Sequence, residues 1–351
     1  MNTRSLSSAS HRIHGGSRRG TPARDWWVGG VLVLAVASLP LLPFMNGYLL
    51  GVVVRVLIFV ALGQSWNVVA GIGGQLSLGH GVFFGLGAYT TVLLFNGPGI
   101  TPWLGAWVGV LISILVAVVM GGATFRLRGV YFALATVAIS LGFEKVGRHF
   151  SELTGGDAGL AVRFLGDAPW AMQFRGAGPF LWLSLGLVVA FYLLTRWLLT
   201  SRFGYQLQAV RDDEEAAAAS GVDVYRTKLL GFVLSAAMTS LVGTLHVQSY
   251  LAIDPGTAFG LFQAIQIQLP SLIGGLGTAL GPVIGGVIMV VVSEATNWAS
   301  TKLGLEGVDV LVYGLMLLAI IILAPAGVIG TLRESQRGRS GSVRTGRAHV
   351  R

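Results

Sequence analysis

The sequence predicts an all-α membrane protein, a polytopic bundle of about ten transmembrane helices. Of its 351 residues, 53% are hydrophobic and only 11% are charged, whereas a soluble domain carries roughly 25% charged residues. Residues 56–125 contain no Asp, Glu, Lys or Arg at all. Because one crossing needs about 20 apolar residues, this stretch alone holds about three crossings. The soluble alternative is therefore rejected.

Ten apolar segments, bounded by charges, glycine or proline, are the predicted spans. They lie at 26–44, 48–69, 77–95, 102–124, 129–147, 179–199, 228–250, 261–275, 277–297 and 308–330. The first is too long for a typical signal-peptide core and no small-residue cleavage site follows it, so we expect it to be retained. Segment 261–275 is short and contains Pro270, so it is either a span or a re-entrant segment buried in protein. The predicted count is eight to ten, with interrupted or re-entrant segments.

The distribution of basic residues predicts the orientation of the chain. The net charge is +9, and nearly half of the basic residues lie in two tails, 1–25 and 331–351, which flank the membrane domain 26–330. The positive-inside rule places both tails, and hence both termini, in the cytoplasm and requires an even number of spans. It also puts the loop 201–227 in the cytoplasm and the segment 149–178 outside. Basic tails beside spans favour contact with membrane lipid headgroups and argue against a nucleic-acid partner.

Two glycine-dense zones, 71–81 and 274–282, lie in opposite halves of the chain. Interrupted hydrophobic segments at matching places point to the transport path in secondary transporters, and we apply that rule here by analogy. Small residues recur at every fourth position and are expected to share a helix face: Ser77, Gly81 and Gly85 in the first zone, and Gly277, Gly281 and Gly285 in the second. This spacing lets helices approach closely, either around a path that opens and shuts or in static packing.

Polar side chains within the spans are costly in lipid unless they find partners or face a cavity. The candidates for lining a path are Asn67, Gln75, Ser77 and His80. A lone histidine such as His80 is, however, more often a packing residue. No catalytic or metal site is predicted, because the chain has no cysteine and its six histidines show no metal-ligand spacing within the spans.

Four ionic residues lie near the ends of predicted spans. Glu144 and Arg148 are four residues apart and are expected to pair on their helix as an interfacial anchor. Arg55 lies near the outer end of the second span, where its side chain can snorkel towards water. Glu294 lies towards the end of the ninth span, and either role is open for it.

The loop 201–227 contains a predicted helix. Residues 206–220 are strong helix formers, and Gly221 can end that helix. An acidic turn at 212–215 precedes four alanines at 216–219, which leave a surface with almost no side-chain bulk. Such a helix suits docking into a cleft of a partner protein; the alternative is an ordinary solvated linker helix.

The series Glu215-Ala216-Ala217, three residues and then Gly221 resembles the cytoplasmic loop of permeases in binding-protein-dependent ABC importers. Further blocks narrow the family, and they lie at 63–90, 126–132, 153–156 and 273–282. Together they resemble the signature of the high-affinity branched-chain amino acid permeases, and the LivM-type subunit more than the LivH-type. Permeases for urea and short amides share these blocks.

That resemblance implies an assembly in the bacterial cytoplasmic (inner) membrane. The partners would be a second, LivH-like permease, two LivG/LivF-like ATPase subunits in the cytoplasm and a LivJ/LivK-like solute-binding protein outside. The stroke of the ATPases would reach a coupling loop formed by Arg211, Glu214, Glu215, Ala216, Ala217 and Gly221. ATP and Mg would bind those partners, because the only lysines here, Lys145, Lys228 and Lys302, lie outside any Gly-x-x-x-x-Gly-Lys motif. The chain is thus expected to translocate solute and not to be an enzyme.

Two alternatives remain at this stage. The same architecture can carry urea, short amides or a sugar instead of an amino acid. A protein of another class, an ion-coupled secondary transporter or channel, would need no ATPase and predicts ionisable residues deep in the spans. The charge-free stretch 56–125 argues against that second alternative. The solute, and whether the permease pairs with a copy of itself or with a homologue, are not decided by the sequence.

Overall fold

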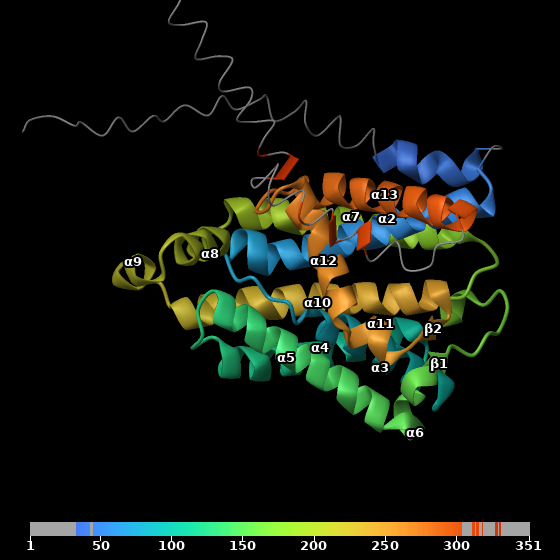
Figure 1. The fold of residues 1–351 in the computed structure, drawn as a ribbon, viewed down its shortest axis with the longest axis horizontal. Coiled ribbons are helices and arrows are strands. Elements are labelled where there is room, and N and C mark those ends of the chain that lie inside the picture. Colours follow the sequence, from blue (N-terminus) through green and yellow to red (C-terminus); the bar gives the residue numbers. More distant parts are fainter. Residues whose placement is uncertain are drawn as a thin grey trace, which may run out of the picture.

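The structure is a computed structural model, and it describes residues 33–42 and 45–303 together with the positions 311, 312, 314, 315, 318, 327, 328 and 330. Its described part is a bundle of long helices, several of which run side by side (Figure 1). The all-α class is therefore confirmed. Both tails, most of the predicted span 26–44 and most of 308–330 lie outside the described residues, although residues 33–38 are helical.

Eight longer helices form the described bundle, and each overlaps a predicted span. They are α2 (Gly47–Asn67), α3 (His80–Asn96), α4 (Pro102–Thr124), α5 (Val130–His149), α7 (Ala177–Thr200), α10 (Val224–Tyr250), α12 (Leu261–Gly274) and α13 (Gly281–Leu303). Among the described residues, six helices are long and apolar enough to cross a membrane: Gly47–Ile72, Pro102–Thr124, Val130–His149, Ala177–Thr200, Val224–Tyr250 and Gly281–Lys302. The predicted count of ten is thus not confirmed. Helices α3 and α12 have only 17 and 14 residues: non-helical backbone takes up the first three residues of the predicted span 77–95, whereas the predicted span 261–275 was already short.

The short elements gather at the two ends of the bundle. One end carries α8 (Arg202–Asp212) and α9 (Glu214–Ala219), at the left in Figure 1. The other end carries α6 (Ser151–Thr154), η3 (Gly156–Ala158), β1 (Leu160–Ala161), η4 (Pro169–Ala171), β2 (Ala252–Ile253) and α11 (Pro255–Phe259). The antiparallel pair β1–β2 joins Leu160 to Ile253. The loop 201–227 and the segment 149–178 therefore lie at opposite ends of the bundle, and the side of the membrane that each occupies stays a prediction. We call these ends the loop end and the outer end.

Helix α10 forms the centre of the bundle, packed between α2, α3 and α4. Close approach requires glycine at its crossing with α3: a Cβ on Gly243 would overlap the Phe84 carbonyl, and a Cβ on Gly87 would overlap the Ser240 carbonyl. Hydroxyl groups satisfy one another inside, as Thr91 Oγ1 and Thr244 Oγ1 do at 2.9 Å. Small residues that let two backbones meet are the usual device for packing helices in lipid.

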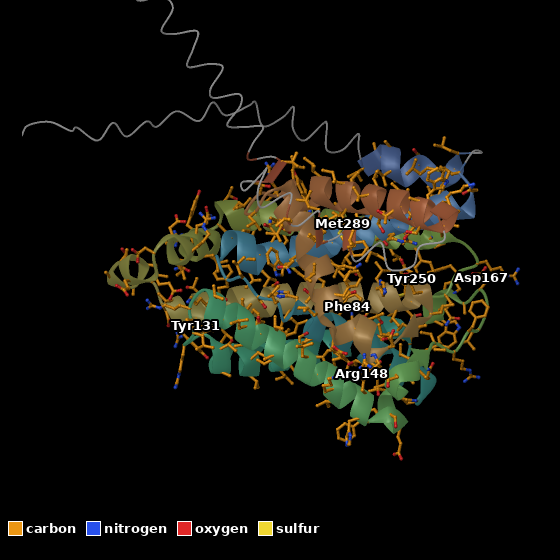
Figure 2. All side chains as sticks on the ribbon, viewed as in Figure 1. Phe84, Tyr131, Arg148, Asp167, Tyr250 and Met289 are labelled. Atoms are coloured by element: carbon orange, nitrogen blue, oxygen red, sulfur yellow. The ribbon has the colours of Figure 1, made fainter. Side chains whose placement is uncertain are left out.

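The outward face of α4 is apolar along its length. Leu111, Leu115 and Val119 are 61%, 67% and 72% exposed, whereas Phe84 of α3 lies within the bundle (Figure 2). A continuous exposed apolar face of this kind is unfavourable in water and favourable against lipid. Burial in this chain therefore follows the pattern of a membrane protein.

Candidate functional site

The two glycine-rich zones meet inside the bundle. After α2 the chain continues as a π-helix, η2 (Val68–Ile72), and then runs without helix to His80; a second non-helical stretch joins α12 to α13. Asn67, fully buried, bridges them. Its Oδ1 accepts the N–H of Gly277 at 2.8 Å, and its Nδ2 donates to the Thr278 carbonyl at 3.0 Å. One side chain thus satisfies backbone groups that the interruption leaves unpaired within the bundle.

Three positions of this junction favour glycine. A Cβ on Gly71 would overlap Asn67 Oδ1 and the Gly277 nitrogen. Gly277 and Gly74 have φ values of +70° and +71°, in the left-handed region that L side chains rarely adopt. A π-helical turn beside such a junction is a frequent mark of functional sites. The interruption predicted from glycine content is therefore present in both halves, and the two halves are in contact.

His80 begins α3 and is 1% exposed. Its Nε2 lies 2.7 Å from Ser235 Oγ, and that hydroxyl donates to the Ser65 carbonyl at 2.6 Å. Because the Ser235 hydrogen is engaged, the hydroxyl must accept from Nε2–H, which leaves Nδ1 as the acceptor from Ser77 Oγ at 3.2 Å. A neutral imidazole with both nitrogens satisfied thus joins the non-helical stretch 73–79 to α10.

The four predicted path residues therefore differ in their partners. Asn67, Ser77 and His80 are buried and hydrogen-bonded within the chain. Gln75 is 9% exposed, and its Oε1 is buried without a partner. A buried orphan acceptor is uncommon and calls for an explanation such as a ligand or water. Whether these residues line a path stays a prediction.

The predicted glycine faces are partly wrong. Helix α3 begins at His80 and α13 at Gly281, so Ser77 and Gly277 lie in non-helical backbone and share no helix face with the other glycines. The remaining four glycines do lie at close contacts. A Cβ on Gly85 would overlap the Phe259 ring, one on Gly285 the Pro270 carbonyl and one on Gly281 the Gly275 carbonyl, while Gly81 leaves 3.2 Å to Ser140 Oγ.

The loop end contains two helices where one was predicted. The expected helix 206–220 is interrupted at Asp213, which adopts extended backbone and caps α9 by accepting the N–H groups of Glu215 and Ala216 at 2.9 and 3.0 Å. An aspartate is among the best N-caps, and that preference overrides the helix propensity of its neighbours. Gly221, at φ +87°, ends α9 as predicted.

The surface of α9 is small and apolar, as predicted. Ala217 is 4% exposed, whereas Ala216, Ala218 and Ala219 are exposed. The helix extends beyond the rest of the bundle (Figure 1). Both carboxylates of α9 form ion pairs with residues of the bundle: Glu214 pairs with Lys228, and Glu215 pairs with Arg128 at 3.3 Å. The acidic turn thus orients α9 on the starts of α5 and α10.

Arg211, in the last turn of α8, links this loop to the glycine junction. Its Nη1 donates to the Gly71 carbonyl at 3.2 Å, and its Nη2 lies 2.9 Å from Asp212 Oδ1. A Cβ on Gly74 would overlap the Arg211 Cγ, and one on Gly277 would lie 3.4 Å from its Nη1. Sequence reasoning placed Arg211 in the loop but gave no sign of these contacts, which span about 140 and 66 residues of chain.

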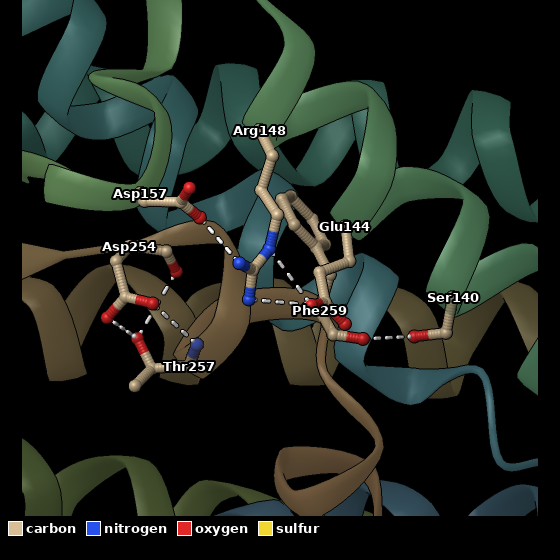
Figure 3. A network of polar contacts seen from close by, with 7 residues as sticks. All are labelled: Ser140, Glu144, Arg148, Asp157, Asp254, Thr257 and Phe259. Carbon is tan, nitrogen blue, oxygen red and sulfur yellow. Dashed lines mark hydrogen bonds and ion pairs between the residues drawn. The ribbon is translucent and has the colours of Figure 1, made fainter. Parts of the chain in front are cut away.

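A second polar network closes the outer end (Figure 3). Arg148 pairs with Glu144 at 2.9 Å, as predicted, and also with Asp157. Ser140 Oγ donates to the Phe259 carbonyl at 2.8 Å. The Arg148–Asp157 pair ties η3 to α5, and the Ser140 bond holds the stretch 252–260, which includes β2 and α11, against α5. The pair is therefore a clamp between elements as well as an interfacial group.

No contact between Arg55 and Glu294 was predicted from the sequence. The two residues form an ion pair that joins α2 to α13. The second oxygen of Glu294 accepts the hydroxyl of Tyr48 at 2.6 Å. Mutual neutralisation explains how both charges are accommodated near the outer end of a membrane helix.

Interrupted helices that meet inside an apolar bundle, with a protruding loop attached to their junction, define a multi-pass membrane transport protein. Residues 48–321 match the family described as the permease component of branched-chain amino acid transport systems. The chain belongs to that family.

Curated relatives agree with this assignment. The LivM permease of the high-affinity branched-chain amino acid transport system from Salmonella typhimurium is 28% identical, and that from Escherichia coli K12 is 27% identical; each alignment covers 90% of this chain and 77% of the relative. The LivH permease of Salmonella typhimurium is 27% identical over 78% of this chain and 91% of its own. No solved structure matches the chain at a significant level.

Proposed function

We propose that this chain is the transmembrane permease subunit of an ABC importer that moves branched-chain or related amino acids inward across the bacterial cytoplasmic membrane. Energy comes from ATP hydrolysis on two partner subunits, which hold ATP and Mg. A second, LivH-like permease completes the path, and a solute-binding protein delivers the solute at the outer end. The resemblance of this chain to both LivM and LivH permeases supports the pairing with a homologue.

The family match over residues 48–321 carries this proposal, and the contact of Arg211 with Gly71 supports its coupling step. The small apolar face of α9 suits a cleft on an ATPase, and α9 packs on α8. Movement of α8 would pull directly on the glycine junction through the Arg211 guanidinium. The loop therefore transmits movement to the glycine junction, and ATP hydrolysis on the partner subunits drives that movement.

ATP-dependent uptake of leucine into proteoliposomes tests the function. The chain is reconstituted with the second permease, both ATPases and the binding protein, and uptake is measured with ATP or with a non-hydrolysable analogue inside. Leucine uptake that requires hydrolysis is the expected result. Uptake of urea, a short amide or a sugar in place of any amino acid would assign the same architecture to another solute.

Purification from the native membrane separates this proposal from an ion-coupled carrier or channel. We expect two ATPase subunits to co-purify with the chain in a mild detergent. Solute flux by the purified chain alone, driven by an ion gradient and without an ATPase, would support the carrier instead.

A further inference from the structure

A cavity of about 430 Å³ lies at the outer end, between the first turns of α2 and α7 and the last turn of α10. Its volume falls within the range of about 300–1,000 Å³ that is usual for small-molecule sites. The glycine junction and the loop end contribute none of its lining residues. Tyr250, which borders it, is labelled in Figure 2.

The polar wall of this cavity is positive. Arg55 and Arg175 line it, and no Asp or Glu does. In the part of the chain that the structure describes, no carboxylate lies within ion-pair distance of Arg175, whereas Arg55 pairs with Glu294 and keeps a buried Nε without a partner. Glu294 thus neutralises one arginine and leaves the other available.

The backbone adds to that positive character. Gly176, the N-cap of α7, and Ala177, its first residue, line the cavity, and no side chain caps this 24-residue helix. Pro179 in the first turn has no N–H, so Ala177 and Gly178 carry the free N–H groups that attract anions. Two arginine side chains and the N-terminus of α7 therefore line the same cavity.

The remaining wall is apolar. Val52, Val54 and Phe180 line it, with the rings of Tyr48 and Tyr250 at its border. A ligand that satisfies both walls carries one anionic group of carboxylate size, which arginine recognises with charge-assisted hydrogen bonds, and a compact aliphatic body.

We propose that this cavity binds the carboxylate of an aliphatic amino acid as the solute enters the permease. This inference rests on the proposed import function. It adds a solute-binding site within the permease itself, at the outer end and away from the glycine junction. Arg175 is its anion ligand, and Arg55, neutralised by Glu294, forms part of the wall.

Direct binding to the assembled transporter in nanodiscs of zwitterionic lipid, without the binding protein, tests the proposal. The probe is radiolabelled leucine, in competition with 4-methylpentanoate, which keeps the carboxylate and lacks the ammonium, and with leucinamide, which lacks the carboxylate. We expect 4-methylpentanoate to compete and leucinamide not to. Equal competition by leucinamide would overturn the proposal.

Substitution of Arg175 locates the site. Arg175→Gln is expected to weaken leucine binding by about tenfold or more, as the loss of a charge-assisted hydrogen bond does. The control is Arg163→Gln, an exposed arginine of the same outer segment that does not line the cavity, and we expect no change. Wild-type uptake of leucine with unchanged binding in Arg175→Gln would refute this site and leave the import function standing. Arg175-dependent binding of 4-methylpentanoate without leucine uptake would support this site and refute the import of leucine.

A lipid phosphate offers the same anionic chemistry as a carboxylate. The binding experiment is therefore repeated in nanodiscs that contain phosphatidylglycerol, where unchanged leucine binding is expected. Loss of leucine binding in those discs would assign the cavity to a lipid headgroup and overturn the proposal.

Discussion

Arg211 lies in α8, within the loop 201–227, and its side chain contacts both glycine-rich stretches. Its guanidinium donates to the Gly71 carbonyl, and its aliphatic part packs against Gly74. Lysine carries the same charge but lacks the planar fork that lets arginine serve a carbonyl and Asp212 together. The contact is therefore specific to arginine, and in the proposed mechanism it passes movement of α8 to the glycine junction.

Replacing Arg211 with Gln should uncouple ATP hydrolysis from transport. Hydrolysis by the assembled importer persists, because α9 keeps its docking surface, while leucine uptake falls by about tenfold or more, as expected for a lost hydrogen bond from a charged group. Uptake and hydrolysis are measured in the same proteoliposomes. Arg202→Gln, an exposed arginine at the start of α8, serves as the control. Tightly coupled transport by Arg211→Gln would remove this residue from the mechanism.

Gly71 tests the junction itself. A methyl group in Gly71→Ala overlaps Asn67 Oδ1 and must displace the Asn67 bridge, which we expect to destabilise the protein by about 1–3 kcal/mol, as overpacking does. Thermal unfolding in detergent measures the loss. Gly186→Ala in α7, where a Cβ meets nothing within 4 Å, should be neutral or stabilising because alanine favours the helix. Equal melting temperatures for the two variants would show that the junction accommodates the added methyl group without loss of stability.

At the scale of elements, the helices could be predicted and their junctions could not. Spans such as Pro102–Thr124 follow from apolar length bounded by Pro and charge, and the predicted limits 102–124 coincide with the helix. Glycine-rich backbone carries no periodic side chains, so the starts of α3 and α13 were placed too early. Contacts such as Asn67 with Gly277 join distant parts of the chain, and a single sequence holds no signal for them.

Helix α9 shows what the structure adds to a motif. Replacing Gly221 with a bulky residue, or Ala217 with Arg, should uncouple transport, but Gly221 has positive φ and Ala217 is buried, so both changes also disturb the helix. Ala218→Arg alters only an exposed position. We expect it to abolish co-purification of the ATPases and leucine uptake with no change in the melting temperature of the chain. Ser220→Arg, also exposed, maps how far the docking face extends. Normal uptake by Ala218→Arg would exclude α9 as the docking surface.

At the scale of the whole molecule, two polar clamps lie at opposite ends of one apolar bundle. Arg211 fastens the glycine junction to α8, Arg148 ties η3 to α5 at the outer end, and Ser140 holds the neighbouring stretch 252–260 through the Phe259 carbonyl. Phe259 of that stretch packs on Gly85 and stacks on Tyr89, with ring centroids 5.7 Å apart. Different residues form the two clamps, so each end of the bundle is held by its own contacts.

Arg148→Gln should therefore loosen the outer end selectively. Its ion pairs are partly exposed, with Asp157 at 76%, and exposed pairs contribute about 0.2–1 kcal/mol, so hydrogen exchange of η3, residues 156–158, should rise by at most about fivefold. Exchange at the loop end, in residues 202–219, should stay the same, because the two clamps share no residue. Arg163→Gln provides the matched change at the outer end without an ion pair among the described residues. A uniform rise across both ends would mean that the bundle opens as one unit, and the independence of the two clamps would have to be abandoned.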